Sequence, residues 1–545
     1  MKEKENVMIA WGKPKALRID IDLIAQYTNY KSSDEIFKLN EKTLVDLDFY
    51  SFYKFVDRTS SSVGQQCLYH KLISQSDSKE KLEKQEQSVK FYNSNLDKKL
   101  NSQLALKKLA NPNDYYFPYL IFSALPERMY NYWIILFLQV AMVLSVVLCF
   151  KYPIFFLSII LLFTVNISLH YLHKNRIGNF TVYFSRLTNL SNTLRKILPI
   201  SNVSEHKQSN LQSDIKHIDK ITSQVLFLKT DNLQNSEFGS VFWFVFEIFK
   251  IITLSEITVF NKLVDKIRVS RPQIENVCTA IGEIDIAISI CSLRDGLPYY
   301  SIPTFEKQSK ELEVKALYHP LVTDCIANDI ALQDKSLLLT GSNMAGKSTF
   351  IKAVNLNALS SQVLNTSFTN YYKAPIWKLM TSMNIKDQLE EDSSYYMEEV
   401  NSIGQLITCS EESDKRYLFT IDEIFKGTNT IERISTAKAI LQYLNKSEHL
   451  VLVSTHDIEL TKLLQEGFDL YFFQESITDK TLSFDYKIKK GTLEKSNAIS
   501  ILEIVGYPRV ITEEARALAE KLKNEKTGER ISGICTLCYR TDILQ

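Results

Sequence analysis

The sequence has almost no excess of charge: 64 Lys and Arg against 63 Asp and Glu leave a formal charge of +1 over 545 residues. A strongly basic chain would indicate a nucleic-acid partner. This balance neither supports nor excludes one, because a local basic patch can be cancelled by acidic residues elsewhere. The length allows about three or four domains, and 45% apolar residues are enough to build a large core.

The sequence is also poor in paired cysteines. Most of the eight cysteines stand singly, which is typical of a protein from a reducing compartment. Cys535 and Cys538 alone form a C-x-x-C pair. A structural zinc site takes four ligands, and the tail offers no second pair and no nearby histidine. We therefore interpret the tail as without a metal site.

Signals for export and for repeats are missing as well. Met1 to Glu5 is charged and no apolar run follows it, so no N-terminal signal peptide is expected. No segment repeats with a period of about 20–50 residues, which argues against a solenoid or a propeller.

What the sequence does contain is a pair of long apolar runs. Residues 131–150 carry no charged side chain, Lys151-Tyr152-Pro153 interrupts, and residues 154–172 are again almost wholly apolar. Each run has about the 20 residues that a helix needs to cross a bilayer. The pattern predicts a transmembrane hairpin, with a buried hairpin in a soluble core as the alternative. Arg128, Lys174 and Arg176 flank the hairpin and predict that both long flanks lie in the cytoplasm.

A third apolar stretch, Val241 to Phe260, differs from this pair. It contains Glu247, Lys250 and Glu256. Charged residues disfavour a membrane span, so we expect a core helix or a helix on a membrane surface.

From Ile302 onward, candidate strands alternate with candidate helices. This alternation predicts an open, mostly parallel α/β sheet. The expected strands are Val314–Leu317, Ser336–Thr340, Leu418–Ile421 and Leu450–Ser454, with a last one at Asp485–Ile488. The expected helices are Ser348–Ser361, Tyr396–Ser410, Ile434–Leu444 and Glu459–Gln465, then two in Ala498–Leu522 broken at Gly506-Tyr507-Pro508.

The sharpest motif follows the strand at Ser336–Thr340. Its spacing, G-x-x-x-x-G-K-[ST], is that of a phosphate-binding (Walker A) loop, whose backbone N–H groups surround a triphosphate. A lysine then binds the β- and γ-phosphates and a hydroxyl ligates Mg²⁺. The candidate nucleotide-binding residues are Gly341, Ser342, Asn343, Met344, Ala345, Gly346, Lys347, Ser348 and Thr349.

Two later strands end in groups that complete such a site. Tyr417 to Ile421 ends in Asp422, a candidate Mg²⁺ ligand, and Glu423, a candidate base for the attacking water. Val451 to Val453 leads to Ser454-Thr455-His456, in which His456 is placed to contact the γ-phosphate. Glu423, Lys347 and His456 are therefore the candidate catalytic residues, and Ser348 and Asp422 the candidate metal ligands.

These motifs together resemble the ATPase domain of the MutS mismatch-repair family. The resemblance rests on Asn343-Met344 inside the loop, on Asp422-Glu423-Ile424 followed by Gly427-Thr428-Asn429-Thr430, and on Ser454-Thr455-His456. Tyr318-His319-Pro320 and Asp57-Arg58-Thr59 are similar to the family's lead-in to the loop and to the start of its helical core.

The resemblance implies ATP and Mg²⁺ as cofactors and a homodimer with composite sites. In that case Asn328 lies near the adenine, Tyr486 takes a position where the family often stacks a histidine, and Ser393 reaches the partner's nucleotide. Taken alone, Ser393 also fits a helix N-cap. Double-stranded DNA is the family's substrate, and an unidentified protein at the membrane is a further possible partner.

The chain also departs from the family pattern. Cys325 stands where an aromatic residue usually stacks on adenine, and Glu391-Asp392 replace a glycine before Ser393. We find no counterpart of the mismatch-reading domain, and the apolar hairpin takes the place of part of the lever arm. The expected segments are 1–45, the first part of a helical core at 46–125, the hairpin at 126–176, a helical lever with the second part of the core at 177–300, the ATPase domain at 301–497, dimerising helices at 498–525 and a tail at 526–545.

The sequence therefore predicts an α/β P-loop NTPase domain that follows an all-α region with a transmembrane hairpin. The expected function is a membrane-tethered, MutS-like ATPase that binds DNA. The alternative is an ATP-driven membrane scaffold or motor that has lost mismatch recognition and DNA binding.

Overall fold

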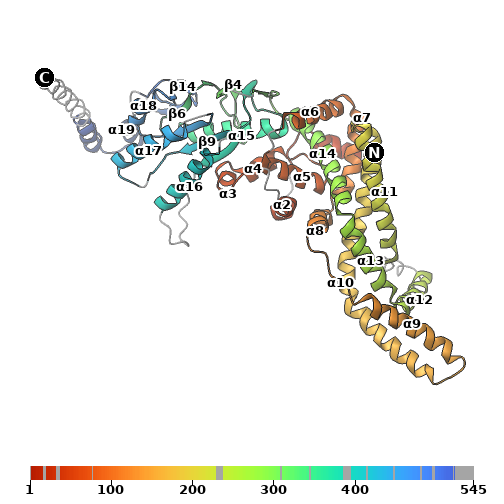
Figure 1. Ribbon diagram of the computed structural model, residues 1–545. Coiled ribbons are helices and arrows are strands. Elements are labelled where there is room, and N and C mark those ends of the chain that lie inside the picture. Colours follow the sequence, from red (N-terminus) through yellow and green to blue (C-terminus); the bar gives the residue numbers. More distant parts are fainter. Residues whose placement is uncertain are drawn as a thin grey trace, which may run out of the picture. The chain divides into compact units, whose positions relative to one another are not determined.

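The computed structural model describes residues 2–15, 20–31, 37–75, 78–228, 237–306, 310–342, 345–383, 395–412, 415–426, 428–445, 448–478, 481–493, 498–519 and 521. The chain divides into two compact units. Unit 1 comprises Met1–Leu39, Asp48–Ile302 and Leu359–Ser367, and unit 2 comprises Asn40–Leu47, Pro303–Ala358 and Phe368–Gln545. The helical half of the chain thus precedes the half that contains the larger sheets (Figure 1).

Unit 1 is built almost entirely from helices. They are α1 Lys2–Ala10, α2 Ile21–Tyr30, α4 Phe49–Val56, α5 Ser62–Ile73, α6 Lys79–Ser94, α7 Leu96–Leu106, α8 Phe117–Phe122, α9 Tyr132–Cys149, α10 Phe155–Ile197, α11 Glu205–Leu228, α12 Glu237–Thr253, α13 Ser255–Val269 and α14 Arg271–Asp295. Three short 3-10 turns, Lys107–Leu109, Pro112–Tyr116 and Leu198–Ile200, and the two-residue strands β1 Phe37–Lys38 and β2 Ser74–Gln75 complete it.

The core of unit 1 surrounds α14, which is 83% buried over its apolar window. Asp285, fully buried on α14, accepts hydrogen bonds from the backbone N–H groups of Ser60 and Ser61, both at 2.8 Å, ahead of α5. Ser61 in turn caps α5 by accepting from the Gly64 N–H at 2.9 Å. Ser61 thus fixes the start of α5.

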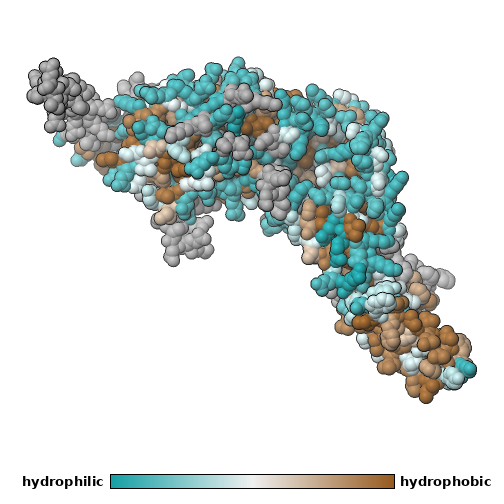
Figure 2. All heavy atoms as spheres, viewed as in Figure 1, coloured by the Kyte–Doolittle hydropathy of each residue, from teal (hydrophilic) through white to brown (hydrophobic). Residues whose placement is uncertain are grey.

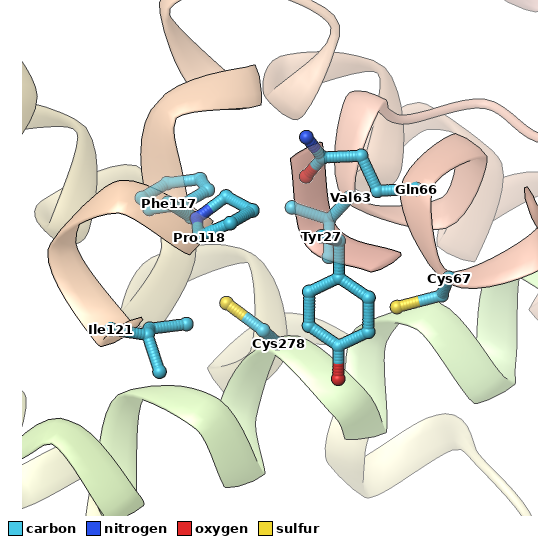
Figure 3. Close-up of a pocket in the computed structure, with 8 residues that line it drawn as sticks. All are labelled: Tyr27, Val63, Gln66, Cys67, Phe117, Pro118, Ile121 and Cys278. Atoms are coloured by element: carbon cyan, nitrogen blue, oxygen red, sulfur yellow. The ribbon is translucent and has the colours of Figure 1, made fainter. Parts of the chain in front are cut away.

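A small pocket lies where α2, α5, α8 and α14 meet (Figure 3). Cys67 of α5 and Cys278 of α14 both line it, and both are free thiols. Burial raises the pKa of Cys67 to about 12 and that of Cys278 well above its usual value. These thiols are protonated at neutral pH, so they behave as apolar packing groups.

The two apolar runs form antiparallel helices, α9 and the first half of α10, which project from the rest of unit 1 (Figure 1). Only 17% of Tyr132–Cys149 and 11% of Phe155–Lys174 is buried. Both helices are long and apolar enough to cross a membrane, and Figure 2 shows the continuous apolar surface. α10 runs unbroken to Ile197, since no proline occurs between Pro153 and Pro199.

Unit 2 contains the sheets. Its strands are β3 Thr304–Phe305, β4 Glu311–Leu317, β5 Asn328–Gln333, β6 Ser336–Thr340, β7 Tyr371–Ala374, β8 Lys378–Ser382, β9 Tyr417–Asp422, β10 Leu450–Ser454, β11 Phe468–Phe472, β12 Glu475–Thr478, β13 Thr481–Phe484 and β14 Lys489–Lys490. Its helices are α3 Glu41–Asp46, α16 Tyr395–Ser410, α17 Thr430–Leu444, α18 Glu459–Leu464 and α19 Ala498–Val505; most of α15 Lys347–Leu364 also belongs here.

The larger sheet has the strand order β14-β11-β6-β10-β9-β8. All its pairings are parallel except that of β14 with β11. Every residue of β6, β8 and β10 is buried, as expected for parallel strands covered on both faces. The predicted, mostly parallel sheet is confirmed. A second sheet has the strand order β3-β7-β4-β5, and its strand β5 directly precedes β6 in the sequence.

One predicted strand is wrong. Residues 485–488 are not a strand but a connection between β13 and β14. Tyr486 has a φ of 49°, a conformation that a β-strand does not allow. The Asn328 side chain holds this backbone instead, donating to the Tyr486 carbonyl at 3.0 Å and accepting from the Ile488 N–H at 2.9 Å. By contrast, the predicted break at Gly506-Tyr507-Pro508 is confirmed, with Gly506 at a φ of 93°.

Candidate functional site

The candidate site lies at the carboxyl ends of three neighbouring strands, β6, β10 and β9. β10 lies between the other two, and Ser454 at its end pairs with Leu339 of β6 and Asp422 of β9. Parallel strands end at the same edge, so the residues that follow them converge there. Polar groups from three distant segments of the chain meet as a result.

The loop after β6 depends on two glycines. Gly341 has a φ of 139° and Gly346 a φ of 101°, values that glycine adopts far more easily than other residues. A Cβ at Gly341 would lie 2.6 Å from the Phe473 carbonyl oxygen, so a side chain does not fit there. The buried Ser342 Oγ has no hydrogen-bond partner among the described residues. The loop thus presents an unsatisfied hydroxyl beside the start of α15.

Lys347, the first residue of α15, is 2% exposed. Its Nζ donates to the carbonyl oxygens of Gly341 at 2.7 Å and Ser342 at 2.9 Å, and lies 3.4 Å from His456 Nε2. Burial lowers the pKa of Lys347 to about 8, although Asp422 acts in the opposite direction. A buried ammonium at a helix N-terminus is favoured when an anion binds beside it.

Asp422 accepts hydrogen bonds from two hydroxyl groups, one at the start of α15 and one at the end of β10. Ser348 Oγ donates to its Oδ2 at 2.6 Å, and Ser454 Oγ donates to its Oδ1. Ser348 is exposed at this point. Hydroxyl and carboxylate oxygens are the ligands that Mg²⁺ prefers, so the residues present fit this ion.

Glu423 follows Asp422 with a φ of 58°. This left-handed backbone is sparsely populated for residues other than glycine and costs free energy. Its N–H donates to the Ser454 carbonyl at 2.9 Å, and its Oε1 lies 3.1 Å from His456 Nε2. Lys426 Nζ is 2.5 Å from the other carboxylate oxygen. Burial, with Lys347 and Lys426 nearby, lowers the pKa of His456, so its ring is neutral at pH 7.

The remaining predicted residues divide into three groups. Asn328 is buried and bonded to the backbone around Tyr486, and a Cβ on Gly346 would lie 3.3 Å from the Tyr486 ring. This pair therefore lies against the loop. Ala345 is buried and Thr349 is exposed on α15. Asn343, Met344 and Ser393 lie outside the described residues, as does Gly427.

Sequence reasoning missed two groups that shape the site. Ser454 was noted in a motif but not as a partner of Asp422. Glu399, on α16, accepts hydrogen bonds from the backbone N–H groups of Phe425 at 2.5 Å and Lys426 at 3.3 Å. It thereby fixes the segment after Glu423, in which Phe425 also has a positive φ of 56°. No spacing signal links Glu399 to that segment, because the two are brought together by the fold.

Comparison with known proteins gives one consistent result. The family model of MutS domain V matches residues 337–523. Curated relatives include the DNA mismatch repair protein MutS of Leptospira interrogans, 30% identical over 297 residues, which are 52% of this chain and 34% of that protein. Those of Caldanaerobacter subterraneus subsp. tengcongensis and Thermus thermophilus are 28% identical over 288 residues and 26% identical over 284 residues.

This chain carries the MutS family's domain V over residues 337–523. The matches to the Caldanaerobacter and Thermus proteins each cover 51% of this chain, and they cover 32% and 34% of those two proteins. The chain thus spans about a third of the length of the curated MutS relatives it matches. The domain V match begins at Leu337 in β6 and includes β9 and β10, so all three strands of the candidate site fall inside it.

Proposed function

We propose that this MutS-family protein is an ATPase of the P-loop class, which hydrolyses ATP to ADP and phosphate. The observation that carries the proposal is the meeting of Ser348, after the β6 loop, with Asp422, at the end of β9. A phosphate loop that shares a hydroxyl–carboxylate pair with a neighbouring strand is the arrangement that P-loop NTPases use to hold Mg²⁺ and a triphosphate.

Each residue has a defined role in this reaction. Lys347 exchanges its two backbone carbonyl partners for the β- and γ-phosphate oxygens, and the N–H groups of the loop bind the remaining oxygens. Ser348 and Asp422 would hold Mg²⁺, which when bound neutralises charge on the transferred phosphoryl group. Glu423 accepts a proton from the attacking water, and His456 hydrogen-bonds the γ-phosphate.

The test of this activity is phosphate release from ATP by the purified full-length protein. We expect Mg²⁺-dependent hydrolysis that Lys347→Ala abolishes, because nothing else described at the loop supplies a buried cation. Hydrolysis at the unaltered rate by Lys347→Ala would contradict the proposal.

We further propose that the protein acts as a homodimer whose sites are composite, with Ser393 of each protomer near the other's nucleotide. The family resemblance supports this arrangement. Mixing Ser393→Ala protein with Lys347→Ala protein tests it, because one intact composite site forms in a mixed dimer. Restored hydrolysis relative to either variant alone supports exchange of Ser393 between protomers.

The proposed substrate of the ATP-driven movement is double-stranded DNA, on the basis of relatives named DNA mismatch repair protein MutS. The test is binding to matched, mismatched and branched duplexes over a series of salt concentrations, because phosphate contacts weaken as salt rises. A protein that hydrolyses ATP but binds no duplex at low salt would instead support the second candidate, a membrane scaffold or motor with an unidentified protein partner.

We also propose that the α9–α10 hairpin spans a membrane and that both flanks are cytoplasmic. The low burial of its apolar windows, 17% and 11%, supports this, because a hairpin in a soluble core would be covered by other elements. After cell lysis, the protein should sediment with membranes and require detergent for extraction. Recovery in the soluble fraction without detergent would contradict the tether.

A further inference from the structure

Helix α12 has its polar and apolar faces reversed relative to a helix of a soluble protein. Glu247 and Lys250 are buried, at 4% and 2% exposure. Among its described side chains, those that α12 exposes are large and apolar: Val241, Phe244, Val245, Phe249 and Ile252. Water disfavours this arrangement twice, because it exposes apolar surface and buries charge. A hydrocarbon environment favours both features.

The buried charges of α12 are fully paired. Glu247 lies 3.1 Å from His170 Nε2 and 3.3 Å from Lys250 Nζ, and Lys174 approaches it as well. Glu256, on α13, lies 3.2 Å from His170 Nδ1. Ionisable side chains within a membrane face the protein interior and pair with one another. This cluster joins α10, α12 and α13 in that manner.

The end of α12 is bonded to both helices of the hairpin. Gln139 of α9 donates to the Thr253 carbonyl at 2.6 Å, and Asn166 of α10 donates to the Ile252 carbonyl at 3.2 Å. A helix leaves its last carbonyl groups without intrahelical partners, and in lipid such groups must be satisfied by protein. Gln139 and Asn166 meet that requirement from within the two apolar runs.

These contacts also fix the depth of α12. Gln139 lies eight residues inside the run that begins at Asn131, or about 12 Å at about 1.5 Å per residue. Asn166 lies six residues before Leu172, or about 9 Å from that end. If the hairpin crosses a bilayer, the carboxyl end of α12 must lie about 10 Å below the surface.

The chain then turns and leaves. Leu254, between α12 and α13, has a φ of 45°, and α13 leads back to the base of the hairpin, where Asn261 bonds both the N–H and the carbonyl of Met129 at 3.0 and 2.9 Å. Figure 1 shows α12 and α13 beside the base of the hairpin. The expectation of one core or surface helix over Val241–Phe260 therefore gives way to two helices joined by a turn.

We propose that α12 and the start of α13 form a re-entrant element that dips into the same leaflet as the hairpin base, with the Phe244–Phe249 face of α12 against lipid acyl chains. The proposal rests on the proposed membrane tether. The exposed face of α12 contacts lipid rather than protein, because this face is continuous with the apolar hairpin and the charged side chains of α12 point away from it.

The test is photo-crosslinking of the full-length protein in phosphatidylcholine–phosphatidylglycerol vesicles. Benzoylphenylalanine, which reacts with nearby C–H bonds, replaces Phe244 or Phe249 in separate variants. Phe156, 59% exposed on the hairpin, is the positive control, and Tyr30, 40% exposed on α2, is the aromatic control outside it. ATP hydrolysis of each variant reports that the protein is folded.

We expect lipid adducts at Phe244 and Phe249 within a few-fold of the yield at Phe156 and at least tenfold above the yield at Tyr30. If Phe156 gives lipid adducts but Phe244 and Phe249 give no more than Tyr30, the re-entrant element is overturned and the tether stands. Crosslinks from α12 to a second copy of the chain would overturn it as well. Absence of lipid adducts at Phe156 would contradict both the proposed membrane tether and the re-entrant element.

Discussion

Ser348 and Asp422 are 74 residues apart in the sequence, yet Ser348 Oγ donates a 2.6 Å hydrogen bond to the Asp422 carboxylate. One residue belongs to the helix after the phosphate loop and the other ends a strand two positions away in the sheet. Ser454, at the end of the strand between them, donates to the other carboxylate oxygen. Asp422 is thus oriented from both sides before any ion binds.

The first prediction concerns Ser454→Ala. Loss of the Ser454 hydroxyl leaves Asp422 held from one side only, by Ser348, and loss of a group that orients a metal ligand weakens metal affinity by about 10–100-fold. We expect the Mg²⁺ concentration for half-maximal ATP hydrolysis to rise by about tenfold or more. A Mg²⁺ titration of the steady-state rate measures this. Ser410→Ala is the control, because among the described residues that hydroxyl donates to the Ile407 carbonyl of its own helix. An equal shift in both variants would contradict the role of Ser454.

The second prediction concerns Glu423→Gln. Replacing a general base by its amide lowers the chemical step by about 10²–10⁴-fold, while Lys347 and Ser348 still bind ATP. The variant should retain a fluorescent ATP analogue and release almost no phosphate. Lys426→Ala removes the exposed cation paired with Glu423 and should change the rate only slightly, since exposed ion pairs contribute about 0–1 kcal/mol. Normal turnover by Glu423→Gln would exclude it as the base.

The third prediction is a pH dependence of ATP binding. The pKa of Lys347 in the free protein is lowered to about 8, mainly by burial. The protonated form binds phosphate, so affinity should be nearly constant below pH 8 and fall above it, by up to about tenfold per pH unit. Isothermal titration of a non-hydrolysable ATP analogue from pH 7 to above pH 9 measures the trend. Constant affinity across that range would show that the Lys347 charge does not govern binding.

The fourth prediction concerns stability of unit 1. Arg294 on α14 donates to both carboxylate oxygens of Glu86 on α6, at 2.9 and 2.7 Å, and both residues are buried. Glu86→Ala leaves a buried charge unpaired and should lower the free energy of unfolding by about 3–5 kcal/mol. The double variant Glu86→Leu with Arg294→Met should lose much less, because no charge remains buried.

Chemical denaturation of the three proteins measures these differences. Lys207→Ala, which breaks the exposed pair between Lys207 and Glu283, is the surface control, with an expected loss of about 1 kcal/mol or less. A Glu86→Ala loss no larger than that of the control would show that the Arg294 charge is already solvated.

The parts of the site that follow directly from local sequence were predictable. Glycine spacing marks the loop, apolar runs mark β6, β9 and β10, and Asp422 and His456 follow their strands. The Glu399 contact with the Phe425 backbone could not be predicted, because it depends on how α16 packs beside β9. The strand expected at Asp485–Ile488 failed for a related reason: the Asn328 side chain, more than 150 residues away, takes the hydrogen bonds of that backbone.

The same distinction holds in unit 1. Ser61 caps α5 through the Gly64 N–H, a local signal that sequence carries. The reversed polar and apolar faces of α12 could not be predicted from the sequence, because an apolar stretch with Glu247 and Lys250 gives no indication of which face will point inward. His170 and Lys174 on α10, which the fold brings near Glu247, decide that.

The central place of β10 has a consequence for how the protein is made. The strand that joins the two halves of the site, Leu450–Ser454, is translated about a hundred residues after the Gly341–Ser348 loop. Until it inserts, β6 and β9 have no shared neighbour, and Asp422 lacks its Ser454 hydroxyl. A ribosome-bound chain that stops short of β10 therefore exposes an incomplete sheet, and the proposed nucleotide site is assembled only late in synthesis.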